Sequence, residues 1–331
     1  EGNMEKKNNK IVYILVGIVL LAFPFAAEKV FNWNYGVLLA NFMILYIIAV
    51  SGLDILFGYS GQISMGHAAF FCIGAYGSVL LHEFTGLPVL ITILIGTVLA
   101  TLIGSLLAYP ASKLVFHFLS LATIAFGEVV YQLVAQSPGN ITGNFTGKFT
   151  ETISLFGFKL NTYTKYYFFS VVCMVIFLII KTNLVRSRVG RAFIAIRENS
   201  HAANGMGINV RKYKVIAFAT SAFYTAFAGG LYAHLVRFIS PDTFTQKQSV
   251  MFLTMLLFGG SASVGGTVTG VFTVQFLNEI LRSAERYQLL IYGVLLLVVI
   301  LAFPGGLFGL VKQAIKKVKT RKEANANASA S

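Results

Sequence analysis

The ionisable residues that lie inside apolar stretches are the first candidates for chemistry in this sequence. Asp54, Glu128 and Glu279 each fall within a run of apolar residues. A charge in such surroundings is costly, so it either lines a polar path or ties neighbouring helices together. Glu279 lies near the end of its run, where water is close, which favours the structural role. For Asp54 and Glu128 both alternatives stay open, and we expect no lysine or arginine partner for them inside the apolar runs.

Catalytic and metal-binding signatures are missing from the chain. The nearest phosphate-loop candidate, Gly143–Phe149, has three residues between its glycines and Phe after its lysine. Such a loop needs four residues there and Ser or Thr after the lysine. Cys72 and Cys173 lie in apolar runs and are typical of small buried side chains. The five histidines show no metal-ligand spacing: His67, His82, His117, His201 and His234. We therefore predict a chain that is not an enzyme and binds no metal or cofactor.

The composition places these residues in a membrane protein. Of the 331 residues, 56% are apolar and only 11% are charged, and the mean hydropathy is +0.74. A soluble chain of this size has about 25% charged residues to cover its surface. The net charge of +14 is concentrated in a few polar segments. Loops that follow the positive-inside rule explain that concentration better than nucleic-acid binding does.

The elements that must position the candidate residues are membrane-spanning helices. The predicted fold class is all-α: a polytopic helical membrane protein with about ten (8–10) spans, each near the length that a bilayer requires. The eighth stretch is too short to cross comfortably and is interpreted as a half-helix or as a helix tilted within a cavity. The predicted spans are 11–27, 33–56, 63–82, 88–109, 114–135, 163–180, 215–236, 248–260, 264–281 and 287–303.

A glycine-rich stretch at residues 58–77 carries the densest set of candidate site residues. One interpretation is a discontinuous helix beside a cavity, because broken backbone at membrane depth survives only where protein or water satisfies it. The other is a tight turn followed by a closely packed helix. For His67, a packed and hydrogen-bonded side chain is favoured over a proton relay. The candidate pathway residues are Asp54, Gly58, Gly61, Gln62, Ser64, Gly66, His67 and Glu128.

The distribution of basic residues orients the predicted spans. The segment 181–214 carries eight Lys and Arg residues, Lys181 among them, and the tail 304–331 carries six. Both segments and the N-terminus are therefore predicted to be cytoplasmic, and 136–162 becomes the longest external loop. We expect residues 1–10 to form a cytoplasmic N-terminus whose Glu1-Gly2-Asn3 is a tag remnant. Residues 11–310 are then the transmembrane domain, and 311–331 a basic, disordered tail.

The polar segment 186–207 has the pattern of a structured loop. Ala192, Ala195, Ile196 and Asn199 follow helical spacing, and Asn199 or Ser200 is a capping residue for a second short helix that ends at Gly205 or Gly207. Such a loop could be a docking site for a soluble partner or a solvated basic loop that only sets topology. A solvated loop does not need alanines and an isoleucine on one face, so docking is favoured.

At this point the residues resemble a known family. The run Gly58-Tyr-Ser-Gly-Gln-Ile-Ser-Met-Gly-His-Ala-Ala-Phe70, the loop from Gly190 to Gly207, and Phe303-Pro-Gly-Gly-Leu-Phe-Gly309 are similar to the permease subunits of branched-chain amino acid ABC importers. Within that family the chain looks like the larger, M-type subunit, and the resemblance covers about residues 33–310. Asp54 departs from the neutral amide that the family usually has there.

The resemblance implies a passive translocation subunit in a bacterial cell membrane. Its partners would be a second permease subunit in a heterodimer, two cytoplasmic ATPases that bind ATP and Mg, and an extracytoplasmic binding protein. The implied cargo is leucine, isoleucine or valine, with urea or a short amide as the alternative. The loop is then the coupling loop to the ATPase, with these residues: Gly190, Arg191, Ala195, Arg197, Glu198, Asn199, Ala203 and Gly207. Arg191, Arg197 and Glu198 would contact the ATPase through their charges.

Two other classes stay open on the residues alone. An ion-coupled secondary transporter would work without ATPase partners, and the scattered carboxylates count modestly against it. A membrane-embedded enzyme would use His67 and Glu128, but convergent catalytic groups are not found around them.

Overall fold

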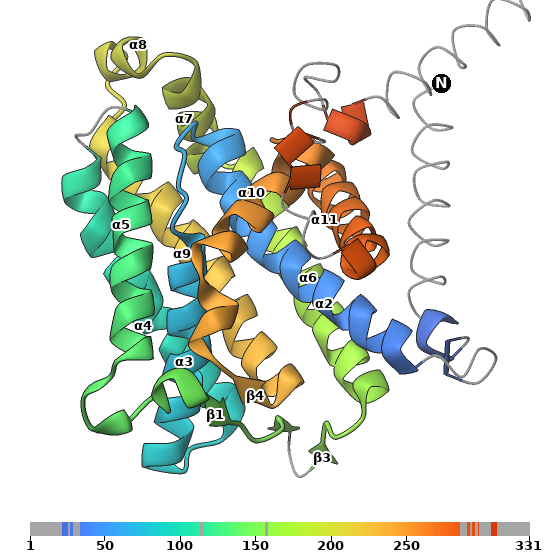
Figure 1. Ribbon diagram of the computed structural model, residues 1–331. Helices are drawn as coiled ribbons and strands as arrows, with labels where there is room; N and C mark the ends of the chain where they lie inside the picture. The colour runs from blue at the N-terminus through green and yellow to red at the C-terminus, as the bar shows by residue number, and fades with distance from the viewer. Residues whose placement is uncertain are drawn as a thin grey trace, which may run out of the picture.

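The computed structural model describes residues 34–112, 116–155 and 158–284, together with 22–25, 27–28, 290–291, 293–294, 297 and 306–309. Helices dominate these residues and run side by side in a bundle (Figure 1). This arrangement confirms the predicted all-α, polytopic class. Most of the first and tenth predicted spans, the N-terminal ten residues and the tail from 311 lie outside the described residues.

The first half of the described chain contains the following elements. They are α2 (Asn34–Asp54), the π-helical turn η2 (Ile55–Tyr59), α3 (His67–Thr85), α4 (Val89–Ala111), α5 (Phe116–Ala135), the 3-10 turns η3 (Pro138–Asn140) and η4 (Asn144–Thr146), and the short strands β1 (Lys148–Phe149), β2 (Ser154–Leu155) and β3 (Phe158–Lys159).

The second half contains the remaining elements. They are α6 (Tyr163–Arg186), α7 (Arg188–Glu198), α8 (Ser200–Gly205), α9 (Val210–Val236), β4 (Phe238–Ile239), η5 (Pro241–Phe244), α10 (Gln246–Gly259), α11 (Val264–Ile280) and the 3-10 turn η6 (Leu281–Ala284).

Six helices among the described residues are long and apolar enough to cross a bilayer. They are Asn34–Tyr59, His67–Thr85, Val89–Ala111, Phe118–Ala135, Tyr163–Arg186 and Val210–Val236, and each coincides with a predicted span. α10 has 14 residues, about 21 Å at the helical rise, so it is shorter than the hydrocarbon layer. This agrees with the interpretation of the eighth stretch as a half-helix.

The two ends of the bundle are built differently. α7 and α8 lie at one end, and the strands between α5 and α6 lie at the opposite end (Figure 1). There β1 pairs antiparallel with β4, with Lys148 opposite Ile239, and β2 pairs with β3. The chain therefore reaches opposite ends of the bundle at 136–162 and at 187–209, as the alternation of spans predicts.

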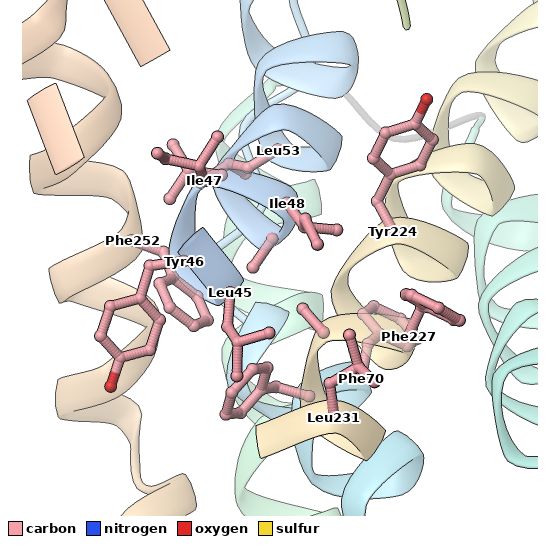
Figure 2. Packing of buried hydrophobic residues seen from close by; sticks show 14 of the residues in the cluster. Leu45, Tyr46, Ile47, Ile48, Leu53, Phe70, Tyr224, Phe227, Leu231 and Phe252 are labelled. Atoms are coloured by element: carbon pink, nitrogen blue, oxygen red, sulfur yellow. The ribbon is translucent and has the colours of Figure 1, made fainter. Parts of the chain in front are cut away.

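α9 lies at the centre of the core and contacts α2, α3 and α4. Small residues bring these helices together, because backbone approach replaces hydrophobic burial as the source of helix association in lipid. A Cβ added at Gly74 of α3 would lie 1.9 Å from the carbonyl oxygen of Ala226 in α9. Large side chains fill the rest, and Figure 2 shows Leu45, Phe70 and Leu231 from three of these helices in one cluster.

Candidate functional site

The chain is broken between α2 and α3 inside the bundle. The π-helical turn ends at Tyr59, residues 60–66 are not helical, and α3 begins at His67. Gly61 has a φ of +70°, a conformation that favours glycine because it has no Cβ. The break predicted from the glycine-rich stretch is therefore present.

A second break precedes α10. β4 lies at the strand end of the bundle, and the chain then turns inward through η5, where Phe244 packs against the rings of Phe71 and Tyr76. α10 begins at Gln246, whose side-chain amide donates to the carbonyl of Met65, 2.8 Å away. The starts of α3 and α10 therefore lie next to each other, and both are inside the bundle.

The middle of α5 is the third component of this region. The backbone N–H of Met65 donates to Thr123 Oγ1 at 3.0 Å, and a Cβ added at Gly66 would lie 2.1 Å from the Thr123 carbonyl oxygen. A Cβ added at Gly127 would lie 3.5 Å from the Gln246 side chain. Since Thr123 and Gly127 lie near the middle of the α5 span, the starts of α3 and α10 lie at membrane depth.

Most polar side chains of the first break are satisfied by protein, although the buried His67 Nδ1 has no hydrogen-bond partner among the described residues. The Gln62 amide donates to Ser60 Oγ at 2.6 Å and to the carbonyl of Lys214 at 3.2 Å. His67 Nε2 lies 2.6 Å from Ser221 Oγ of α9, and His67 is 1% exposed. Ser64 and Gly66 are also buried. The segment is thus discontinuous, as in the first interpretation, and closely packed, as in the second.

Glu128 lies on a polar stripe of α5 that faces away from the described core. Gln132 Nε2 donates to Glu128 Oε1 at 2.9 Å, and Gln136 Nε2 donates to Gln132 Oε1 at 3.1 Å. All three residues are exposed in the described part of the chain. Next to Gln132 in the sequence, Tyr131 donates its hydroxyl hydrogen to Asp242 Oδ1 of η5 at 3.4 Å. A carboxylate with two amides is not stable against lipid tails, so this face requires water or protein.

Sequence reasoning identified Glu128 but missed the rest of this stripe. Gln132 and Gln136 follow Glu128 at intervals of four residues, which places all three on one face of a helix. That spacing is the signal that could have found them. Lys247 is the second residue of α10 and lies exposed beside Gln246. The inward turn of the chain before α10 places it there.

Asp54 is completely buried and has a cationic partner. Its Oδ2 lies 2.8 Å from Lys181 Nζ of α6, and both side chains are 0% exposed. Lys181 Nζ also donates to Thr267 Oγ1 of α11 at 3.0 Å. Asp54 Oδ1 accepts the backbone N–H of Ala262 at 2.7 Å. The expectation that Asp54 lacks a basic partner was wrong, because Lys181 belongs to the membrane helix α6.

The boundary of the basic loop changes with this finding. Lys181 was counted in the loop 181–214, but α6 continues to Arg186. Residues 181–186 are therefore helical, and Lys181 points into the core instead of toward solvent. Composition alone cannot distinguish a lysine at the end of a span from one in the following loop, since long side chains are common at both positions.

The loop after α6 is a pair of capped helices. Ser187 Oγ accepts the N–H groups of Val189 and Gly190 at the start of α7, and Asn199 Oδ1 accepts those of His201 and Ala202 at the start of α8. The predicted cap at Asn199 and the end of the second helix at Gly205 are thus present.

The two helices are held against the bundle by one face. Phe193, Ile196 and Ala203 are buried, whereas Arg191 and Glu198 are exposed. Gly190 packs against the backbone of Val185 so closely that a Cβ there would lie 2.0 Å from its carbonyl oxygen. Of the other predicted loop residues, Ala195 is half-buried and Gly207 is exposed with a φ of +83°.

Arg197 is exposed on α7 but contacts the first break of the chain. Its guanidinium donates to the carbonyl oxygen of Gly58 in the π-helical turn. Its aliphatic stem lies over Gly61, where an added Cβ would be 3.1 Å from Arg197 Cγ. Arg197 therefore joins the loop to the first break of the chain.

The strand end of the bundle has a recess of about 530 Å³ between the end of α3 and residues 148–151. Its charged side chains pair with one another: Lys148 with Glu83, and His82 Nε2 with Glu151 Oε2 at 3.4 Å. Among the described residues, no group of three or more His, Cys, Asp or Glu residues could hold a metal ion, and Cys72 and Cys173 are free and buried.

Comparison with known proteins identifies the architecture. The family described as branched-chain amino acid transport system, permease component, matches residues 36–300. The chain belongs to this permease family. The match covers most of the chain and includes both breaks, the α5 stripe and the α7–α8 loop, and it confirms the family resemblance of the glycine-rich run.

Individual relatives agree with the family. The permease is 28% identical to the high-affinity branched-chain amino acid transport system permease protein LivM of Escherichia coli K12, over 96% of this chain and 78% of the relative. It is 25% identical to the probable LivM of Methanocaldococcus jannaschii over 68% and 70% of the two chains. It is also 26% identical to the ribose import permease RbsC of Haemophilus influenzae, over 90% and 93%. No solved structure matches the chain significantly.

Membership of this family fixes the type of protein. The permease is a non-catalytic, multi-pass membrane subunit of an ABC importer, and subunits of this type bind no cofactor of their own.

Proposed function

We propose that this permease imports branched-chain amino acids as one of two different permease subunits in an ATP-driven complex. Two cytoplasmic ATPases supply the free energy, and an extracytoplasmic binding protein delivers leucine, isoleucine or valine. The cargo assignment is supported by the two relatives named LivM. The similarity to RbsC over 90% of this chain makes a sugar the competing cargo, in addition to urea or a short amide.

The observation that carries the proposal is the α7–α8 loop. It is stiffened by two side-chain caps, it is fixed to the bundle by Phe193 and Ile196, and it presents Arg191 and Glu198 to solvent. A stiff element with an apolar inner face and a charged outer face is suited to transmit a rigid-body motion. We assign this outer face to the ATPase, with Glu198 as a charged contact, and we assign Arg197 to the connection between the loop and the bundle.

We assign the translocation path to the exposed face of α5 and the start of α10. Glu128, Gln132 and Gln136 form a continuous polar stripe at membrane depth. Asp242 and Lys247, both exposed, lie beside it at the second break. The face carries acidic, basic and amide groups together, which suits a zwitterion better than a sugar. The second permease subunit closes this face from lipid.

The proposed mechanism is an alternation between two states. ATP binding closes the ATPase pair, the α7–α8 loop follows that movement, and the path changes from outward-open to inward-open. No residue of this chain forms or breaks a covalent bond in the cycle. Within the proposal, the α7–α8 end and both termini are cytoplasmic, and the strand end with its recess receives the binding protein.

The deciding experiment is purification from native membranes followed by reconstitution. We expect two ATPases and a second permease to copurify, and we expect vesicles to accumulate leucine only with ATP and the binding protein. Uphill uptake by the chain alone, driven by an ion gradient, would contradict the proposal. Uptake of ribose or urea in place of leucine would contradict the cargo but leave the mechanism standing.

A charge reversal tests the docking surface. Glu198→Arg should reduce ATPase copurification and transport-coupled ATP hydrolysis by about tenfold, because it replaces an attraction at the loop with a repulsion. Lys159→Glu, an exposed reversal at the opposite end of the bundle, is the matched control and should leave ATPase copurification unchanged. Normal copurification and hydrolysis in Glu198→Arg would remove the docking role.

A further inference from the structure

A buried ionic junction lies between the coupling loop and the second half of the bundle. It consists of Asp54, Lys181, Thr267 and the backbone N–H of Ala262. Asp54 comes from the end of α2, Lys181 from α6, Thr267 from α11, and Ala262 from the turn between α10 and α11. One carboxylate and one ammonium thus connect α2, α6 and the α10–α11 hairpin, which are far apart in the sequence.

The junction touches the residue that receives the coupling loop. A Cβ added at Gly58 would lie 2.1 Å from Asp54 Oδ1 and 2.5 Å from the Ala262 nitrogen. Gly58 therefore lies directly against both groups, while its carbonyl oxygen accepts the Arg197 guanidinium of α7. Gly58 thus lies between Arg197 of α7 and the turn between α10 and α11.

The turn at Ala262 is held in an uncommon conformation. Ala262 has a φ of 59°, in the left-handed region that non-glycine residues rarely occupy without support from their surroundings. The support here is the hydrogen bond from its N–H to Asp54. The position of the turn therefore depends on the position of the carboxylate.

α10 and α11 are packed backbone to backbone beyond this turn. A Cβ added at Gly259 would lie 1.8 Å from the carbonyl oxygen of Gly266, and one added at Gly270 would lie 1.9 Å from that of Met255. Backbone contacts of this kind leave no space for sliding. The other end of α10 is Gln246, which binds Met65 next to the middle of α5.

Stability alone does not require an ion pair at this position. Replacing a buried pair with apolar residues of similar volume is often neutral or stabilising, so a buried pair is weak evidence for a purely structural role. An ion pair that joins α2, α6 and the α10–α11 hairpin is better explained as a fixed connection between them.

We propose that Asp54 and Lys181 are positioning residues for energy coupling: they transmit the displacement of α7, received at Gly58, to the α10–α11 hairpin and so to the translocation path. This inference rests on the proposed function, because it takes α7 as the element that the ATPases move. Asp54 and Lys181 contact neither the ATPase nor the cargo in this scheme.

The test compares a neutralised junction with a matched control in the purified, reconstituted complex. The double variant Asp54→Asn/Lys181→Met removes both charges together, and its amide oxygen can still accept the Ala262 N–H. The control is Ser170→Ala, because Ser170 donates to Asn41 at 3.1 Å, a fully buried contact between the same helices α2 and α6 that does not reach Gly58 or Ala262.

We expect the double variant to assemble with its ATPases and to hydrolyse ATP within twofold of the unmodified complex. The amount of substrate transported per ATP should fall about tenfold, within the usual range for coupling between two sites. Ser170→Ala should keep the ratio of the unmodified complex. A purely structural junction would lower the yield of complex but would leave this ratio unchanged in the complex that assembles.

Every other outcome overturns the inference. An unchanged ratio in the double variant, an equal loss in Ser170→Ala, or failure of the double variant to assemble would each leave the pair with a role in folding alone. The single variant Lys181→Met should assemble less well than the double variant, since it leaves an unpaired buried carboxylate. If the unmodified complex itself shows no ATP-driven uptake, the proposed function fails first, so the two failures are distinguishable.

Discussion

At the residue scale, glycines decide where the helices of this permease approach each other. Gly66 lies against Thr123 of α5, and Gly74 lies against Ala226 of α9, at distances that exclude any Cβ. Gly77, one turn after Gly74 on the same helix, meets only Gly96, and an added Cβ would lie at an ordinary contact distance of 3.4 Å. Gly74 and Gly77 of α3 thus differ in whether they tolerate a larger side chain, and the neighbouring sequence does not reveal that difference.

Substitution by alanine should separate these two glycines. Gly74→Ala forces α3 away from α9, and such overpacking costs about 1–3 kcal/mol. Gly77→Ala needs no such shift and gains helix propensity, so it should be neutral or stabilise by up to about 1 kcal/mol. Thermal unfolding of the detergent-solubilised protein measures both. Equal transition temperatures in the two variants would contradict the packing at Gly74.

At the element scale, the two discontinuous helices and α5 form the region that differs from ordinary lipid-facing spans. The exposed side of α4 is apolar, with Val98, Leu102 and Leu106 among its exposed residues, as expected for a surface against lipid tails. The exposed side of α5 carries Glu128 and Gln132 beside apolar residues such as Leu121 and Leu133. The polar residues mark the part of α5 that the proposed function turns away from lipid.

Cysteine labelling should report this contrast. In the assembled transporter, Gln132→Cys should react with a membrane-impermeant maleimide, because only a hydrated thiol ionises and reacts readily. Leu102→Cys on α4 is the control and should stay unlabelled under the same conditions. Equal labelling at both positions, or protection of Gln132→Cys in every nucleotide state, would contradict a hydrated path along α5.

At the scale of the whole molecule, the distribution of basic residues and the arrangement of the helices predict the same orientation in the membrane. The α7–α8 loop and the strand region lie at opposite ends of the bundle (Figure 1), and the loop end carries the basic residues Arg188, Arg191 and Arg197. The positive-inside rule predicts that this end faces the cytoplasm. The recess beside Glu83 and Glu151 lies at the other end.

Side-specific labelling tests this orientation. Met206 beside α8 and Phe149 in β1 are 84% and 85% exposed, so a cysteine at either position is accessible without disturbing the core. In intact cells an impermeant reagent should label Phe149→Cys and should reach Met206→Cys only after permeabilisation. The reverse pattern would invert the proposed topology.

The sequence by itself determined the class of the protein, six of its spans, the cap at Asn199 before α8 and the break after Tyr59. These features depend on local composition and spacing: long apolar runs, Asn199 before a short polar helix, and glycines among polar residues. Local physics is sufficient for them, because a helix cap or a span length involves neighbouring residues only.

Only the tertiary structure decided which faces of the helices meet. Three features join residues that are distant in sequence. Asp54 pairs with Lys181, Arg197 contacts Gly58, and α10 begins inside the bundle. In a soluble protein the apolar stripe of a helix marks its buried side. Here both the core and the lipid are apolar, so the hydrophobic pattern of a span does not show which side is buried, and contacts such as these follow from packing alone.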